Sequence, residues 1–229
     1  MKKNEDTLMK EPYPLTFGEE IGNSISHGVM FFVLLFTLPY YAIRAYTMGG
    51  AMEAAGISVY FFCMMFMFGG SCLYHMMPYH TTYKYVFRKL DHIMILLAIA
   101  GTYTPICLVV LHNWVGYTVL AIEWAMVLAG VLLKSIAKKR YKVLSMTIYM
   151  VMGWMALFIL PALIAHTNWI FLTLLVAGGV LYTVGGVLYA LKWPGRDNPR
   201  FGCHEIFHVF IVLGSVCHFF LMYRVICFL

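Results

Sequence analysis

The most distinctive chemistry in the sequence is the pentapeptide HEIFH at residues 204–208. It fits the H-E-x-x-H signature, in which two histidines four residues apart share one helix face, about 6 Å from each other, and bind zinc. In soluble metalloproteases the intervening glutamate, here Glu205, is the general base. The pentapeptide, however, begins a stretch, residues 202–220, that is apolar enough to cross a bilayer. It therefore indicates a protease site inside a membrane, a different zinc site, or no site.

A second set of polar side chains could complete such a site. Ser71 and His75 are also four residues apart, so the serine hydroxyl shares the helix face that carries the imidazole. His75, His204 and His208 together give three imidazoles, and three histidines with an open fourth position are typical of catalytic zinc. Asp91 would then orient or deprotonate the water at the zinc ion.

Each of these residues also has an ordinary structural explanation. A single intramembrane histidine such as His75 often makes a hydrogen bond between helices. Asp91 could be the N-cap of a helix, a position where Asp is favoured. Ser71 could be a small packing residue after Gly69 and Gly70.

The composition predicts that these residues are held by membrane-spanning helices. Of the 229 residues, 62% are hydrophobic and 11% are charged, whereas soluble domains have roughly 25% charged residues. The apolar runs are long enough for helices of about 20 residues and do not alternate like barrel strands. We expect an all-α bundle of seven transmembrane helices, a single domain spanning residues 21–229, after a short polar tail, residues 1–20. The predicted helices are residues 21–43, 54–77, 92–111, 115–133, 143–165, 168–191 and 203–228.

The basic residues predict how this bundle is oriented. Fourteen of the 16 Lys and Arg residues lie in the tail and in the loops after the second, fourth and sixth helices. Because such residues concentrate on the cytoplasmic side, the amino terminus should be cytoplasmic and the carboxyl terminus outside. The net charge of +6 follows from this bias and suits contact with membrane lipids. Nucleic-acid binding has no support, because the basic residues are scattered over short loops.

This topology places the candidate residues at one depth. Ser71 and His75 lie near the inner end of the second predicted helix, Asp91 starts the third, and His204 starts the seventh. The orientation was deduced without these residues, so their common level favours the metal site. The six cysteines contain no C-x-x-C pair, and we expect no structural disulfide. We also expect no cleavable signal peptide, since the first apolar run ends without a small-residue cleavage site.

Other polar residues within the predicted helices are further candidates. Glu20, Asn23, His27 and Glu205 could support the ligands or line the pocket. Glu20 and Asn23 could equally cap the first helix, and His27 could simply bond to a neighbour.

Two further candidates lie deeper in the membrane. Glu123 and His218 are each about 12 Å or more from the outer ends of their helices, counted at 1.5 Å per residue. Ionisable groups at such a depth are costly and are often functional. We expect the two residues to pair or to line a polar path, although a neutral Glu123 is the simpler alternative.

Five segments resemble the haemolysin III branch of the progestin and adipoQ receptor family, which includes the adiponectin receptors and is similar to the alkaline ceramidases. They are EIGNSISHG (20–28), SCLYH (71–75), KLDH (89–92), AGTYTP (100–105) and HEIFHVFIVLGSVCHF (204–219). The resemblance implies a seven-helix bundle with an inside amino terminus and a zinc ion held by three histidines.

Carried over to this chain, the implied ligands are His75, His204 and His208, with Asp91 and Ser71 beside the metal-bound water. The residue that matches Glu205 is Gln in the adiponectin receptors, which argues against Glu205 as the base. The long soluble amino-terminal region of the animal receptors is absent, so hormone binding is not carried over.

These observations favour a zinc-dependent integral membrane hydrolase that acts on an amide or ester lipid. The substrate class rests on the similarity to ceramidases, and the sequence does not specify an oligomeric state. A multi-pass protein of the plasma or inner membrane is expected. One alternative is a signalling or regulatory protein in which zinc is structural. Another is a pore-forming cytolysin: the almost wholly apolar fifth and sixth helices disfavour an intrinsic channel, while lysis by oligomers stays open. An intramembrane protease is also disfavoured, because its third ligand and its peptide access are not evident.

Overall fold

The computed structural model describes residues 15–136, 142–195, 198 and 201–227. Over these residues the chain is helical, without strands, and has seven helical spans long and apolar enough to cross a membrane. The predicted all-α seven-span fold is therefore confirmed. The helices are α2 (Phe17–Met48), α3 (Ala51–Met76), α4 (Thr82–Pro105) with the π-helix η1 (Ile106–Leu111), α5 (Trp114–Ile136), α6 (Lys142–Trp154), α7 (Ala156–His166), α8 (Trp169–Leu191) and α9 (Cys203–Ile226).

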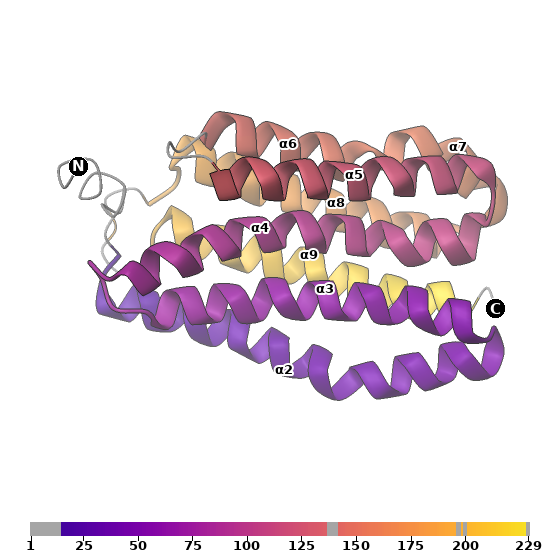
Figure 1. Cartoon of the computed structure of the whole chain (residues 1–229), viewed down its shortest axis with the longest axis horizontal. Helices are drawn as coiled ribbons and strands as arrows, with labels where there is room; N and C mark the ends of the chain where they lie inside the picture. Colours follow the sequence, from indigo (N-terminus) through magenta and orange to yellow (C-terminus); the bar gives the residue numbers. More distant parts are fainter. Residues whose placement is uncertain (1–14, 137–141, 196–197, 199–200, 228–229) are drawn as a thin grey trace.

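The spans form an elongated bundle in which the first and last helices lie close together. In Figure 1, α2 and α3 run side by side along one edge, and α5, α6 and α7 lie along the opposite edge. The last helix, α9, packs against both α2 and α8. Because the number of spans is odd, α2 begins at one end of the bundle and α9 finishes at the other (Figure 1). The start of α9 therefore lies at the same end of the bundle as the start of α2, and the two helices are in contact there.

The first span begins earlier than its apolar run indicates. α2 starts at Phe17 behind a capping box, in which Thr16 Oγ1 accepts from the Glu19 N–H at 3.3 Å and Glu19 Oε2 accepts from the Thr16 N–H at 2.6 Å. The suggestion that Glu20 and Asn23 cap this helix is therefore wrong. Both lie inside the first two turns, and both are buried. Their side chains can reach other helices.

The third span also starts earlier than the predicted residue 92. α4 begins at Thr82, and Thr81 is its N-cap, because Thr81 Oγ1 accepts from the Lys84 N–H at 3.1 Å. Asp91 is thus more than two turns inside the helix, and the N-cap interpretation of Asp91 is wrong. The first turns of α4 carry several charged residues, so hydropathy alone does not reveal them. The first helix ends at Met48, five residues beyond the predicted residue 43, and the remaining predicted boundaries lie within three residues of the observed ones.

The fifth span, predicted as one helix, is two short helices that meet at Met155. α6 ends at Trp154 and α7 starts at Ala156. The phenol of Tyr103, from α4, enters the break: its hydroxyl donates to Gly153 O at 2.9 Å and accepts from the Ala156 N–H at 2.6 Å. A side chain inserted into the backbone hydrogen-bond ladder is a recognised cause of helix breaks.

The core lies around α3. In its apolar 18-residue stretch, 61% of the residues are buried, the largest share among the described spans. Tyr60, Phe61 and Phe68 on this helix are fully buried. All six cysteines are free thiols. The central position of α3 fixes the location of its last turn, which carries His75.

Candidate metal centre

Three imidazoles converge at the end of the bundle where α2 begins. His75 lies in the last turn of α3, while His204 and His208 occupy the first two turns of α9. The Nε2 atom of His204 is 3.4 Å from Nε2 of His75 and 3.1 Å from Nε2 of His208. One ring nitrogen of each residue lies within 4.8 Å of the others. The structure therefore brings together the three histidines that the sequence singled out.

The spacing of these nitrogens suits a tetrahedral zinc site. Zn–N bonds of about 2.0–2.1 Å at tetrahedral angles separate two ligand nitrogens by roughly 3.3 Å. The separations of His204 Nε2 from the other two Nε2 atoms, 3.1 and 3.4 Å, are close to that value. His75 and His208 are buried, and His204 is half-buried. Three nitrogen donors from two helices leave a fourth position without a protein ligand in this cluster, as in catalytic zinc sites.

Glu20 on α2 holds the first of these ligands. Its Oε2 lies 2.5 Å from Nδ1 of His75, and its Oε1 accepts from Nζ of Lys84 at 2.5 Å. A carboxylate at Nδ1 fixes the tautomer that keeps Nε2 available as a metal ligand. Lys84 is itself buried and lies over the rings of Tyr74 and Tyr79 at 4.6 and 4.5 Å. The charge of Glu20 is thereby balanced by a cation.

Glu205, the central glutamate of the pentapeptide, is occupied by structural hydrogen bonds. Its Oε1 accepts from Nδ2 of Asn23 at 2.8 Å, and its Oε2 accepts from the Gly202 N–H at 2.8 Å. Glu205 thus links α9 to α2 and caps its own helix beside His204. With both oxygens engaged and the third imidazole supplied by α3, the site departs from that of a soluble metalloprotease.

His27 supports the third ligand from the same helix face of α2. Its ring stacks on that of His208, with centroids 3.9 Å apart and planes 23° apart, and meets the edge of Phe68 at 4.9 Å. It is 2% exposed, and neither ring nitrogen has a hydrogen-bond partner among the described residues. α2 therefore contacts the cluster at three points. Glu20 contacts His75, Asn23 contacts Glu205 beside His204, and His27 contacts His208.

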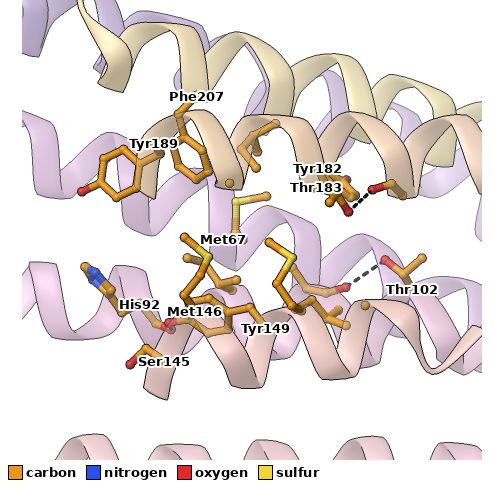
Figure 2. A pocket seen from close by; sticks show the side chains of 18 of the residues that line it. Met67, His92, Thr102, Ser145, Met146, Tyr149, Tyr182, Thr183, Tyr189 and Phe207 are labelled. Atoms are coloured by element: carbon orange, nitrogen blue, oxygen red, sulfur yellow. Dashed lines mark hydrogen bonds between the residues drawn. The ribbon is translucent and has the colours of Figure 1, made fainter. Parts of the chain in front are cut away.

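A cavity of about 780 Å³ reaches the histidines from within the bundle. His204 and His208 form part of its wall, and so do Ser71, Asp91 and His27. Ser71 is 3% exposed and lies one turn before His75 on α3. Asp91 is on α4, and its Oδ2 lies 3.8 Å from Nδ1 of His92. Figure 2 shows how side chains from several helices, among them His92, point into this space.

Comparison with known proteins identifies the family. The family model described as haemolysin-III related matches residues 15–219. This protein belongs to that family. It is 34% identical over 205 residues to a hemolysin-3 homolog of Bacillus subtilis (strain 168), covering 90% of this chain and 93% of the relative. It is also 34% identical over 202 residues to hemolysin-3 of Bacillus cereus, covering 88% of this chain and 89% of the relative.

A shorter match points toward the receptor branch. The chain is 39% identical over 46 residues to the ADIPOR-like receptor IZH2 of Saccharomyces cerevisiae (strain ATCC 204508 / S288c), covering 18% of this chain and 14% of the relative. The resemblance to the haemolysin III branch of the progestin and adipoQ receptor family is thus confirmed. A haemolysin-III-related chain with seven apolar helices is a multi-pass integral membrane protein.

The expected pair of Glu123 and His218 does not form in this haemolysin-III-related protein. Glu123 is fully buried on the stripe of α5 that faces inward, and neither carboxylate oxygen has a partner among the residues described. His218 turns toward α8, where its Nε2 lies 3.3 Å from Leu175 O. Helix depth alone predicted the pair, and depth does not specify the rotation of α5 and α9. Of the two residues, His218 lines the cavity.

Two residues that contact the candidate metal centre, Lys84 and Tyr189, were not predicted from the sequence. Lys84 reads as one of the loop cations that set the orientation, and its buried partner Glu20 is 64 residues away. The ring of Tyr189 on α8 meets that of His204 at 5.5 Å, and no spacing signal marks it. Both depend on how helices pack, which the periodicity of a single sequence does not encode.

Proposed function

We propose that this haemolysin-III-related protein is a zinc-dependent integral membrane hydrolase that cleaves an amide or ester bond of a lipid. The observation that supports this most directly is the convergence of three imidazole nitrogens beside a large cavity, whose wall includes His204 and His208. Asp91 and Ser71 share that wall. The arrangement offers a metal site, a carboxylate and a hydroxyl together, in a space that a lipid can occupy.

The chemistry requires several groups of the chain to act in concert. A zinc ion bound to three histidines supplies Lewis acidity, which polarises a carbonyl group and makes water more acidic. Asp91 accepts the proton that the attacking water loses. Ser71 donates a hydrogen bond to the oxygen that gains negative charge, or holds the water in place. Glu20 keeps the His75 ring in one orientation throughout.

The cavity supports a lipid substrate. Besides the polar residues, its wall includes methionine and aliphatic side chains such as Met64, Met67 and Ile95. Apolar walls of this kind bind acyl chains through burial of surface. The similarity to alkaline ceramidases favours an amide or ester lipid over other lipids.

A comparison of two variants tests the proposal. Purified protein should contain about one zinc ion per chain by elemental analysis. Incubation with a mixed lipid extract should deplete particular amide or ester lipids and release fatty acid. Asp91→Asn should keep zinc and fold but lower turnover by about 100-fold or more, because it removes the proton acceptor. His75→Ala should lose zinc as well as turnover.

A structural role for zinc is the second candidate, and one observation favours it. The centre joins α3 to α9, with α2 bound to both, so a metal ion there would tie three spans together. In that case Asp91→Asn would be harmless to every measured property, while His75→Ala would lower the unfolding temperature. Lipid hydrolysis by wild type that disappears in Asp91→Asn would reject this candidate.

A further inference from the structure

The cavity is polar at both ends and apolar between them. At the end near the metal centre, Figure 2 shows His92, Ser145 and Tyr189, and at the opposite end it shows Thr102, Tyr182 and Thr183. Methionines, including the labelled Met67 and Met146, lie between the two groups (Figure 2). An acyl chain alone requires only apolar walls. Polar groups inside a bilayer are costly unless they are hydrogen-bonded, so what matters at the far end is whether each polar group has a partner.

The threonines at the far end have used their hydroxyl protons. Thr102 Oγ1 donates to Ala98 O at 2.8 Å, and Thr183 Oγ1 donates to Gly179 O at 2.8 Å (Figure 2). A hydroxyl has one proton and two lone pairs, so Thr102 Oγ1 keeps the capacity to accept. Thr183 Oγ1 already accepts from Nε1 of Trp154 at 3.1 Å, which leaves it one lone pair.

His218 gives the clearest sign of a missing partner. It is 6% exposed and lines the cavity. Its Nε2 lies 3.3 Å from Leu175 O, which is satisfied when Nε2 carries the proton. Nδ1 is then an acceptor, and it has no partner among the described residues.

The ring of His218 is held firmly in place. It meets the edge of the Tyr182 ring at 5.3 Å, and the Tyr182 hydroxyl pairs with Ser215 Oγ at 2.8 Å. A Cβ at Gly178 would clash with Nε2 and Cδ2 of His218, so the glycine leaves the space that the ring occupies. The imidazole is therefore positioned by packing from α8, and a substitution at Gly178 would displace it.

We infer that the far end of the cavity binds a hydroxyl group carried on the apolar body of the lipid. A ligand hydroxyl there can donate to Nδ1 of His218, an acceptor that has no partner among the described residues. His208 and His218 are ten residues apart on one helix, which separates them by ~15 Å along its axis. The matching lipid has its reacting carbonyl at the histidines and its hydroxyl about that distance down the chain.

Competition binding tests this inference without turnover. It rests on the proposed function only in placing the reacting end of the lipid at the histidines. Purified protein in detergent binds radiolabelled stearic acid, and unlabelled stearic acid or its 12-hydroxy derivative displaces the label. We expect the hydroxylated acid to bind roughly 3- to 10-fold more tightly, the effect of one net hydrogen bond. In His218→Phe, which keeps the ring size but removes both nitrogens, the two acids should bind equally.

A matched control comes from the other end of the cavity. His92→Phe should keep the preference, because His92 lies near the metal centre. Equal binding of the two acids to wild type, or a preference that survives in His218→Phe, would overturn the inference. A protein that shows the preference but cleaves no lipid keeps this inference and rejects the proposed hydrolase. A protein that cleaves lipid but binds the two acids equally keeps the proposed hydrolase and rejects this inference.

Discussion

At the scale of single residues, the metal centre depends on which nitrogen of each imidazole is left free. Glu20 engages Nδ1 of His75, which leaves Nε2 directed at the Nε2 atom of His204. Glu20 in turn is balanced by Lys84. A buried carboxylate with a cation on one oxygen and an imidazole on the other has little freedom to rotate. The orientation of the His75 ring is thus fixed by protein contacts.

Removing the charge of Glu20 should weaken metal binding. Glu20→Gln loses the carboxylate that orients His75, and loss of such a partner typically lowers metal affinity by about 10- to 100-fold. Zinc affinity would be measured by competition with a fluorescent chelator. Because Gln leaves the buried Lys84 without a counter-charge, the double variant Glu20→Gln, Lys84→Met is needed to separate affinity from stability.

Two comparisons decide the outcome. The double variant should unfold at a temperature closer to wild type than the single variant does, yet still bind zinc weakly. Glu19→Gln, which alters only the capping box of α2, should bind zinc as wild type does. Wild-type affinity in both Glu20 variants would contradict the assigned role.

Part of the candidate site could be predicted from the sequence. His204 and His208 are four residues apart, and His75 lies at the same depth, so the cluster of three histidines was predictable. Ser71 and Asp91 line the cavity as candidates should, while their catalytic roles stay predictions. The pairing of Glu123 with His218 failed because helix rotation is set by packing, which depth does not report.

At the scale of helices, two features depend on hydrogen bonds that hydropathy cannot show. α4 starts at Thr82 because Thr81 caps it, although its first turns carry charges. The fifth span breaks at Met155 because Tyr103 satisfies the backbone on both sides of the break. A polar contact therefore sets the start of α4, and other polar contacts divide the fifth apolar run into two helices.

Removing the Tyr103 hydroxyl should therefore destabilise the bundle. Tyr103→Phe leaves Gly153 O and the Ala156 N–H without their partner, at a cost of about 1–3 kcal/mol for each group that stays unsatisfied. Thermal unfolding in detergent would detect the loss. Tyr149→Phe is the matched control, since its hydroxyl donates a single hydrogen bond, to His92 O at 2.7 Å. A smaller loss for Tyr103→Phe than for Tyr149→Phe would contradict this view of the break.

At the scale of the whole molecule, the seven spans and their order were predictable because each is a long apolar run. What the runs could not give is which helices meet. The contact of α2 with α9 closes the bundle, and a hydrogen bond across it joins Asn23 to Glu205, 182 residues apart. The orientation in the membrane still rests on the distribution of Lys and Arg.

The orientation can be checked with thiol labelling in intact cells. Cys227, at the end of α9, is exposed and should react with a membrane-impermeant maleimide added outside. Cys227→Ser should abolish that labelling. A cysteine placed by Thr81→Cys in Cys227→Ser protein should react only after the membrane is permeabilised. Labelling of the Thr81→Cys protein in intact cells would reverse the assigned topology.

The first span has a consequence for assembly. Its contacts to the centre come from Glu20, Asn23 and His27, which recur at helical spacing along one face of α2. Sliding α2 by one turn, about 5.4 Å, would misalign all three at once. Formation of the histidine cluster with its three α2 contacts therefore requires that the first span is inserted in the correct register. A chain with a misplaced first span would keep its ligands and yet lack the geometry to hold an ion.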